Sequence, residues 1–490
     1  MALKRGWLIL LILGAVYFLT FSALSVLKHR SFHSTYLDLG LEAQSVWNTS
    51  QGRPLRVSFG ENGEEISALS YHVSPVVAFL APLYRVWPTV ELLLIIQTLI
   101  LTLGAVPLYL LAKDLLKSRL LPLIVVISYF LSPSLQWSNL NDFHPQTLAT
   151  TPLLFLFWFY YRKKWFWFFL MLVLSLLIKE NIALVTAVFG LLIIFSKIKP
   201  SFEKRETLIG LAVFILSLFW FLSAVYLIMP FFSGGAMGAL GRYEYLGRTP
   251  GEIIFRLATD WNLDLKILLV PAKIKYLFHL LVSAGFFSLL SPFYLLPAAT
   301  ELILNLFSAY NPQWQVKFHY TAAITPFIYI SAIYGMKRCR TFLAKKSFVA
   351  PVSEIIIAFY LVAISLLWNY AHSPSPLAKD FDSSIYKVAD NDVQRERVLR
   401  SLPVSASVSA MNNLGAHLAN RRYLWRFPIG IEKSDFIVVD PTLPGTNFDL
   451  SQIGAGEFDK IWGPLLTDQR YEIFFQSKNL FILKRNSLLN

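Results

Sequence analysis

The sequence has little charge and almost no cysteine. Asp, Glu, Lys and Arg make up 15% of its 490 residues, whereas a soluble domain typically carries about 25%. Hydrophobic residues make up 55%. The only cysteine, Cys339, has no second cysteine to pair with, so an intrachain disulfide is excluded. Together these shortages exclude an ordinary soluble protein and indicate a polytopic membrane protein.

Several motifs of common enzyme classes are also missing. The chain has no phosphate-binding loop of the GxxxxGK[ST] type, no GxSxG, no GxGxxG and no CxxC pairs with metal-binding spacing. Their absence argues against ATP-driven transport and against serine hydrolase chemistry. Any chemistry must therefore be sought in polar residues outside these motifs.

Acidic residues are scarcer than basic ones, which gives the chain a formal net charge of +14. In a soluble protein this excess suggests a nucleic-acid partner, but here the basic residues cluster in short loops between hydrophobic runs. That is the positive-inside pattern which orients membrane proteins, so we exclude nucleic acid as a partner. The basic loops are residues 113–119, 162–164, 197–205 and 337–346.

The hydrophobic runs predict about eleven transmembrane helices, since each span needs roughly 20 mostly apolar residues. Lys4 and Arg5 place the N-terminus in the cytoplasm. We expect the chain to lie in the plasma (cytoplasmic) membrane. The first run lacks a small-residue cleavage site, so we interpret it as an uncleaved helix. Within 276–309, Pro292 and Pro297 predict a kink or a hairpin. The predicted spans are 7–27, 91–112, 120–135, 147–161, 165–179, 182–196, 207–229, 276–290, 291–309, 320–336 and 351–370.

The spans divide the chain into a multi-pass transmembrane domain, residues 1–370, and a C-terminal extracytoplasmic domain, residues 371–490. The first outer loop of the transmembrane domain covers residues 28–90. Alternating apolar and polar residues at 404–410 predict a strand in the C-terminal domain. We therefore expect a mainly α protein with a small C-terminal α/β domain. Its other elements are predicted as strands at 436–440, 473–475 and 480–483 and a helix at 388–402.

Five polar motifs fall on the predicted outer face, directly between hydrophobic spans. Ionisable residues are costly near lipid, so each such residue is a candidate for function. Their gathering on one face predicts a shared polar site. The motifs are Tyr36-Leu37-Asp38-Leu39-Gly40, Tyr71-His72-Val73-Ser74-Pro75, Asn141-Asp142-Phe143-His144-Pro145, Lys179-Glu180-Asn181 and Lys317-Phe318-His319-Tyr320.

Each motif also has a structural interpretation. Asp38 could cap a helix or pair with Arg53 or Arg56. His72 could be an ordinary surface group. The Asp-x-His spacing of Asp142 and His144 fits a metal pair or an imidazole oriented by a carboxylate. A divalent cation therefore stays open, although metal sites need three or four ligands and we predict no metal-binding residue and no certain cofactor.

The two remaining motifs leave similar alternatives. Lys179 and Glu180 could simply form a polar turn between two helices. Alternatively, Lys179 contacts a phosphate and Glu180 acts as a base or holds a cation. His319 lies among aromatic residues, which fits an interfacial belt or contact with a phosphate or sugar.

Taken in order along the chain, these motifs resemble one family of predicted membrane proteins, domain of unknown function 2079. The resemblance covers roughly residues 30–340 and continues into the tail. One departure is Asn181, because the family commonly has an acidic residue after Lys-Glu. The resemblance rests on Tyr36-Leu37-Asp38-Leu39-Gly40, Gln44, Trp47-Asn48-Thr49, Gly52-Arg53-Pro54-Leu55, His72-Val73-Ser74-Pro75, Ala81-Pro82-Leu83-Tyr84, Asn141-Asp142-Phe143-His144-Pro145, Lys179-Glu180 and Asn412-Asn413-Leu414-Gly415-Ala416-His417-Leu418.

That family looks like the polytopic GT-C glycosyltransferases. The resemblance implies a GT-C-like bundle, a polyprenyl-phosphate-linked sugar donor and an acidic residue in the first outer loop, a role it carries onto Asp38. Glu180 is a second catalytic candidate. The acceptor is a glycan, lipid or protein. Candidate groups for binding substrate are Arg53, His72, Asp142, His144, Lys179 and His319.

Two other functions remain possible at this stage. A lipid or small-solute transporter or flippase predicts charges at mid-membrane and an internal repeat, whereas the charges here lie at span ends and we find no repeat. A non-catalytic membrane scaffold leaves the shared face of Asp38, Glu180 and His319 without a purpose. The sequence therefore favours a membrane glycosyltransferase with Asp38 as general base.

Overall fold

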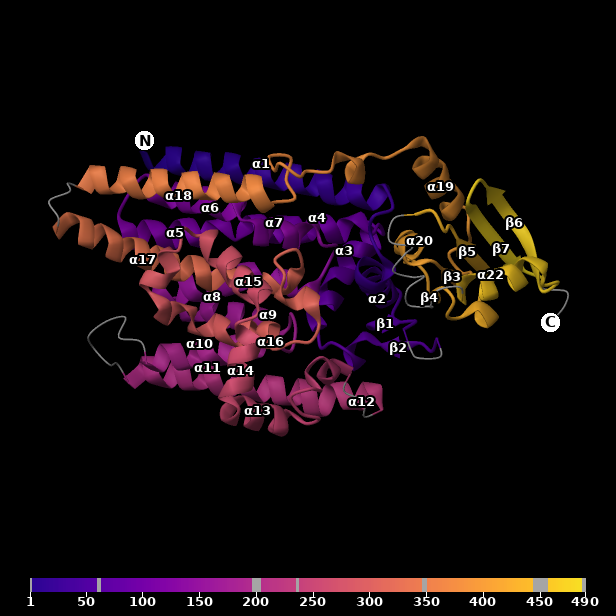
Figure 1. Ribbon diagram of the computed structural model, residues 1–490, viewed down its shortest axis with the longest axis horizontal. Helices are drawn as coiled ribbons and strands as arrows, with labels where there is room; N and C mark the ends of the chain where they lie inside the picture. The colour runs from indigo at the N-terminus through magenta and orange to yellow at the C-terminus, as the bar shows by residue number, and fades with distance from the viewer. Residues whose placement is uncertain are drawn as a thin grey trace.

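A computed structural model describes residues 2–59, 63–195, 204–234, 238–345, 350–443 and 457–486. Long helices run side by side along the molecule, and strands gather at one end (Figure 1). The first helix, α1 (Ala2–Arg30), extends from the opposite end of the bundle toward this strand region. The end of α1 is therefore the point where the bundle and the C-terminal strands meet.

Within the described residues, four helices are long and apolar enough to cross a membrane: Arg5–Arg30, Glu91–Leu116, Arg205–Ser233 and Pro351–His372. A fifth candidate is the pair Leu121–Leu131 and Pro133–Leu140, which bends by 46°. The predicted count of about eleven spans stays a prediction, because other predicted spans are helices too short to cross alone. For example, α9 (Trp165–Leu176) has 12 residues and α10 (Ile182–Phe195) has 14, fewer than the roughly 20 required.

The other elements of the bundle are α4 (Glu91–Leu103), α5 (Ala105–Leu116), α6 (Leu121–Leu131), α7 (Pro133–Leu140), α8 (Thr150–Tyr161), α11 (Lys204–Ser223), η5 (Ala224–Ile228), α12 (Met229–Ser233), α13 (Pro250–Thr259), α14 (Trp261–Leu268), α15 (Pro271–Val282), α16 (Ala299–Leu306), α17 (Thr325–Lys345) and α18 (Ala350–His372).

The spans predicted at 276–290 and 291–309 are not continuous helices. Helix α15 ends at Val282, because Gly285 and Phe286 take positive φ angles of 61° and 56°, which a right-handed helix does not allow. Short 3₁₀ turns follow before α16 begins. The break that the prolines predicted is therefore an irregular stretch several residues long.

The segment after α1 is compact. It begins with η1 (Tyr36–Gly40), a single π-helical turn, which leads directly into α2 (Leu41–Ser50). The hairpin β1 (Arg56–Val57) and β2 (Ile66–Ser67) and the helix α3 (Ala81–Val86) complete the segment. Much of α2 is buried, so η1 is held between α1 and a packed helix.

The C-terminal strands form one five-stranded sheet in the order β4-β3-β5-β7-β6. Strand β3 pairs in parallel with both β4 and β5, whereas β7 pairs antiparallel with β5 and β6. The predicted strands correspond to β3, β5, β6 and β7, and β4 is additional. The elements are α19 (Asp390–Arg400), β3 (Val408–Ala410), α20 (Asn412–His417), β4 (Leu424–Arg426), β5 (Phe436–Val439), α22 (Glu457–Thr467), β6 (Tyr471–Ser477) and β7 (Leu480–Arg485).

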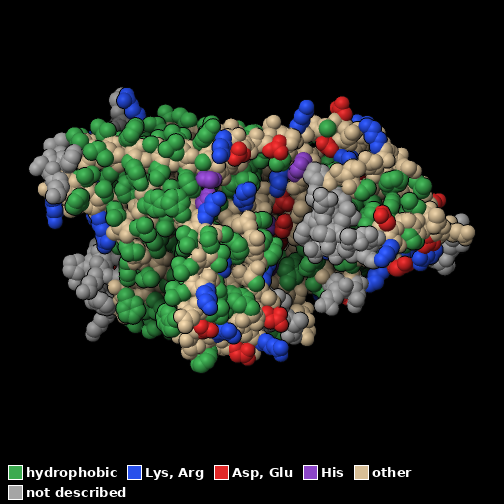
Figure 2. All heavy atoms as spheres, viewed as in Figure 1, with side chains coloured by type: hydrophobic (Ala, Val, Ile, Leu, Met, Phe, Trp, Pro, Cys, Tyr) green, Lys and Arg blue, Asp and Glu red, His purple; other side chains and the backbone are tan. Residues whose placement is uncertain are grey.

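The outer surface of the bundle is apolar. Figure 2 shows hydrophobic side chains covering most of it, while charged side chains concentrate at its ends and on the C-terminal region. Phe219 on α11 and Phe359 on α18 are 68% and 76% exposed. Large apolar side chains exposed in such numbers fit a lipid-facing surface.

Candidate active site

Asp38 lies in the η1 turn, where its carboxylate stays accessible. Thr35 precedes this turn, and its hydroxyl accepts the backbone N–H of Asp38 at 3.3 Å and donates to Oδ2 of Asp38 at 3.2 Å. The Asp38 side chain is nevertheless 45% exposed. The local fold therefore fixes this carboxylate while leaving it open to a ligand.

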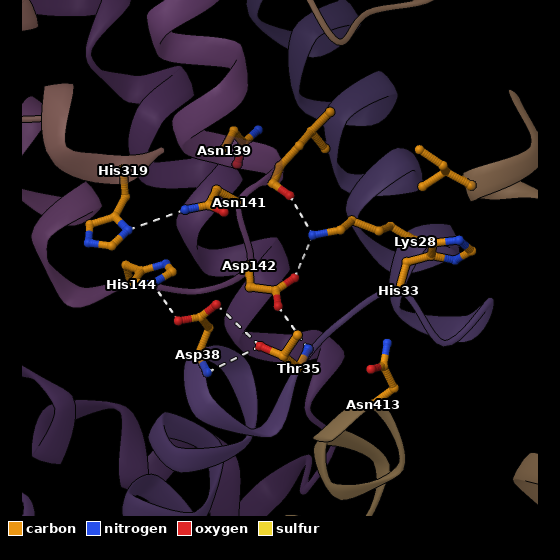
Figure 3. Close-up of polar contacts among 12 residues, drawn as sticks. Lys28, His33, Thr35, Asp38, Asn139, Asn141, Asp142, His144, His319 and Asn413 are labelled. Carbon is orange, nitrogen blue, oxygen red and sulfur yellow. Dashed lines mark hydrogen bonds and ion pairs between the residues drawn. The ribbon is translucent and has the colours of Figure 1, made fainter. Parts of the chain in front are cut away.

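Two histidines lie beside Asp38 (Figure 3). Nε2 of His144 is 3.3 Å from Oδ1 of Asp38. The His144 ring stacks on the ring of His319 with centroids 3.6 Å apart. His319 in turn contacts the side-chain amide of Asn141 at 3.3 Å. Two of the predicted polar motifs are thus joined to Asp38.

Asp142 and His144 do not form a pair. Nζ of Lys28 lies 2.7 Å from Oδ1 of Asp142, and the Thr35 N–H donates to Oδ2 at 3.0 Å. Asp142 has a positive φ of 52°, and its side chain and that of His144 reach different partners (Figure 3). Asp142 therefore supports Thr35, whereas His144 contacts Asp38. Among the described residues, no group of three or more His, Cys, Asp or Glu side chains is arranged to hold a metal ion.

Glu180 binds the motif that contains His72. Its Oε1 lies 3.1 Å from Nδ1 of His72, and its Oε2 accepts the N–H of Val73 at 2.9 Å. Only 11% of the Glu180 side chain is exposed. With both oxygens engaged, Glu180 is better placed to orient His72 than to accept a proton from a substrate.

Lys179 is supported by a chain of amides. Its Nζ lies 3.5 Å from Oε1 of Gln146, and the Gln146 amide donates to Oε2 of Glu301 at 3.1 Å. Asn181 donates to the other oxygen of Glu301 at 2.8 Å. Asn181, where the resemblance predicts an acidic residue, thus donates here to a buried carboxylate.

Lys179 and Arg242 are the basic residues near the two histidines of the site. Burial lowers the pKa of His72 and His319, and these positive charges lower both further, whereas Glu180 acts to raise the pKa of His72. The Arg242 guanidinium donates to Gln313 at 3.1 Å and lies 4.6 Å from the Tyr310 ring centroid. A bound anion would raise the pKa of both histidines and so favour their protonation.

The acidic groups respond differently. Burial acts to raise the pKa of Asp38, but the hydrogen bond and charge of His144, together with the Thr35 hydroxyl, outweigh it and lower that pKa. Burial raises the pKa of Glu42, four residues later, to about 7. Asp38 is therefore the carboxylate that stays ionised and available as a base.

Some predicted residues lie elsewhere, and others were missed. Arg53 follows the far end of α2, about 15 Å along the helix from η1. There it donates to Asn48 at 2.9 Å and lies over the Trp47 ring. Arg242 and Glu42 had no motif around them; for Glu42, its place one helical turn after Asp38 was the available signal.

The fold and the site define the protein as a mainly helical membrane protein with a polar site just beyond the end of α1. The chain belongs to the family described as "Predicted membrane protein (DUF2079)", whose model matches residues 28–452. No curated protein matches the chain.

Among solved structures, the chain is similar to ArnT from Cupriavidus metallidurans, in a crystal structure bound to undecaprenyl phosphate. The TM-score is 0.51 at 11% sequence identity, and the match covers 99% of each chain. This similarity shows a mainly helical fold like that of ArnT, which agrees with the predicted fold class, while the count of about eleven spans and the C-terminal domain stay predictions.

Proposed function

We propose that the protein is a membrane glycosyltransferase that moves a sugar from a polyprenyl-phosphate-linked donor to an acceptor hydroxyl. The observation that carries the proposal is the position of Asp38: a half-buried carboxylate with a lowered pKa that contacts His144, in a site where the charges of Lys179 and Arg242 act on the neighbouring His319. A base and an anion site in one place are what this reaction requires. The similarity to an undecaprenyl-phosphate-bound protein supports a lipid-linked donor.

The proposed reaction is a direct displacement. Asp38 takes the proton of the acceptor hydroxyl, and the acceptor oxygen forms a bond to the anomeric carbon. The bond from that carbon to the phosphate oxygen breaks, and its electron pair leaves with the phosphate. Lys179 and Arg242 stabilise the charge that develops there, since fixed cations act most strongly in a site shielded from water.

The remaining groups hold this machinery in place. We assign Glu180 to orienting His72, because its two oxygens accept from that imidazole and from the adjacent backbone. His144 keeps Asp38 ionised and His319 stacks on His144. By the positive-inside rule, the site and the C-terminal region lie on the extracytoplasmic side of the plasma membrane. The acceptor is a glycan, lipid or protein hydroxyl.

The test is a transfer assay with the purified protein in lipid nanodiscs, using a panel of polyprenyl-phosphate sugars and hydroxyl acceptors. Asp38→Asn is expected to lower transfer by about 10²- to 10⁴-fold, the usual contribution of a general base, with unchanged thermal unfolding. The control is Asp380→Asn, at a side chain that is 80% exposed. Full activity of Asp38→Asn would overturn the assignment of the base, and no transfer by the wild type would overturn the function.

A further inference from the structure

The C-terminal region contacts the segment that carries Asp38 through two neighbouring asparagines. Oδ1 of Asn412 accepts the backbone N–H of Leu37 at 3.1 Å. Nδ2 of Asn413 donates to the carbonyl oxygen of Phe32 at 2.6 Å. Leu37 directly precedes Asp38, so one of these bonds fixes the peptide next to the proposed base.

The two backbones also approach closely. A Cβ atom on Gly415 would lie 2.8 Å from Cβ of Tyr36, and a Cβ on Gly40 would lie 3.3 Å from Cα of Ala416. Tyr36 is 1% exposed, and its hydroxyl donates to the carbonyl of Leu424 at 2.7 Å. Helix α20 and the η1 turn thus fit against each other without room for larger residues.

A third contact holds the end of α1. The ring of His417 stacks on His29 and on Phe32, with centroids 4.0 Å and 3.9 Å apart. Nδ1 of His417 lies 2.6 Å from Oε2 of Glu396 on α19. The segment from α1 to η1 is therefore held at both ends by the C-terminal region. We call the contacts of Asn412, Asn413, Gly415 and His417 with this segment the α20 clamp.

The position of the clamp in the C-terminal sheet is informative. Helix α20 directly follows β3, at the carboxyl end of the parallel strands β4, β3 and β5. Open sheets with parallel strands bind ligands at this end, where the strand order reverses. Here the loop after β3 meets residues 32–40 of the same chain. The place where such a sheet would take a ligand is filled by the segment that carries the proposed base.

We propose that α20 positions the proposed base, with Asn412 and Asn413 as positioning residues that act on Asp38 through Leu37 and Phe32. This inference rests on the proposed function. The C-terminal region contributes no reacting group; it fixes the η1 turn so that the Asp38 carboxylate faces His144. Loss of either asparagine side-chain hydrogen bond frees the turn and lowers the rate of the chemical step more than it weakens donor binding.

The Asn412 side chain accepts a hydrogen bond and the Asn413 side chain donates one. The same substitutions should therefore have different effects at the two positions. The neighbouring atoms fix both assignments, because the Leu37 N–H can only donate and the Phe32 carbonyl can only accept. At position 412, Asp keeps an acceptor and Leu does not, so Asn412→Asp should retain more transfer than Asn412→Leu. At position 413, Asp sets a carboxylate against a carbonyl, so Asn413→Asp should be no better than Asn413→Leu.

The readouts are kcat, the KM for the donor, and amide hydrogen exchange of residues 32–41 without substrate. Asn412→Leu and Asn413→Asp should speed exchange in this segment at least tenfold and lower kcat at least tenfold, with KM changed less than threefold. The matched control is Asn420→Leu, which removes an amide that accepts from Tyr84 at 2.6 Å at a separate contact; it should change neither.

The outcomes separate the two proposals. The clamp is supported by faster exchange together with two results for transfer: Asn412→Asp transfers more than Asn412→Leu, and Asn413→Asp transfers no more than Asn413→Leu. Unchanged exchange in the four variants, or faster exchange with an unchanged kcat, overturns the positioning role. Faster exchange in a protein that transfers no sugar as wild type overturns the proposed function while leaving the contact between α20 and η1 supported.

Discussion

Nε2 of His144 lies 3.3 Å from Oδ1 of Asp38, although the two residues are 106 positions apart in the sequence. The contact joins the turn after α1 to the loop between α7 and α8. An imidazole that can carry positive charge therefore lies beside the carboxylate proposed as the base. The ionisation of Asp38 is thus controlled by a separate segment of the chain.

Replacing His144 should change the pH dependence of transfer. His144 lowers the pKa of Asp38 against the effect of burial, so in His144→Gln that pKa rises. A base acts only when deprotonated, so the acid limb of the kcat/KM profile should move to higher pH, by about 1–2 units for a charge-assisted hydrogen bond.

The control for this measurement is His33→Gln. His33 is bonded to the Ser31 carbonyl at 2.9 Å, not to Asp38, so its replacement should leave the profile in place. An acid limb that stays at the same pH in His144→Gln would show that His144 does not set the ionisation of the base.

Binding of a lipid phosphate should strengthen as pH falls. Burial and nearby positive charge lower the pKa of His72 and His319 in the free protein, and a bound anion raises both pKa values. The complex therefore binds more protons than the free protein, and the Kd for undecaprenyl phosphate should decrease from pH 8 to about pH 6.5. His72→Gln and His319→Gln should flatten this dependence, and a Kd that rises over the same range would contradict it.

Removal of either fixed cation should weaken the same binding. A hydrogen bond to a charged group contributes about 1.5–3 kcal/mol, so Lys179→Met and Arg242→Met should each raise the Kd for undecaprenyl phosphate by about 10- to 100-fold. Arg53→Met is the matched control, since Arg53 contacts Asn48 and Trp47 at the far end of α2. An equal effect of Arg53→Met would mean that general surface charge, not the site, attracts the lipid.

The sequence predicted the gathering of the site well, but not its pairings. Polar residues at span ends must face water or one another, so their collection at one end follows from the membrane alone. Which groups touch depends on backbone detail. The positive φ of Asp142 sends its carboxylate toward Lys28 and leaves His144 to Asp38, and no spacing rule indicates this.

Other parts of the site were hidden for identifiable reasons. Glu301 lies in the middle of the predicted span 291–309, so the prediction that the charges lie at span ends is wrong for this residue. A buried carboxylate inside a span is itself a signal of function. Arg242 lies in a short 3₁₀ turn, η6 (Gly238–Tyr243), between two predicted spans and has no motif around it. Of the C-terminal strands, alternation predicted β3, and β4 was not predicted. The contact of α20 with η1 joins positions more than 370 residues apart and is invisible to local patterns.

Variants of the buried ion pair between Lys28 and Asp142 should distinguish an effect on protein stability from an effect on the position of Asp38. The side chains are 19% and 5% exposed. Asp142→Leu leaves the Lys28 ammonium without its carboxylate partner, although it still donates to the Leu140 carbonyl, so it should destabilise the protein by about 3–5 kcal/mol. Replacing both residues, as Lys28→Met with Asp142→Leu, removes the unpaired charge and should restore much of the thermal stability measured in nanodiscs.

Transfer should not return in the double variant. Asp142 also accepts the N–H of Thr35 at 3.0 Å, and Thr35 in turn bonds both the backbone and the carboxylate of Asp38. That bond is lost whether or not Lys28 is present, so kcat should stay low while the melting temperature recovers. Equal recovery of stability and kcat would show that Asp142 acts on folding alone, and that the position of Asp38 does not depend on it.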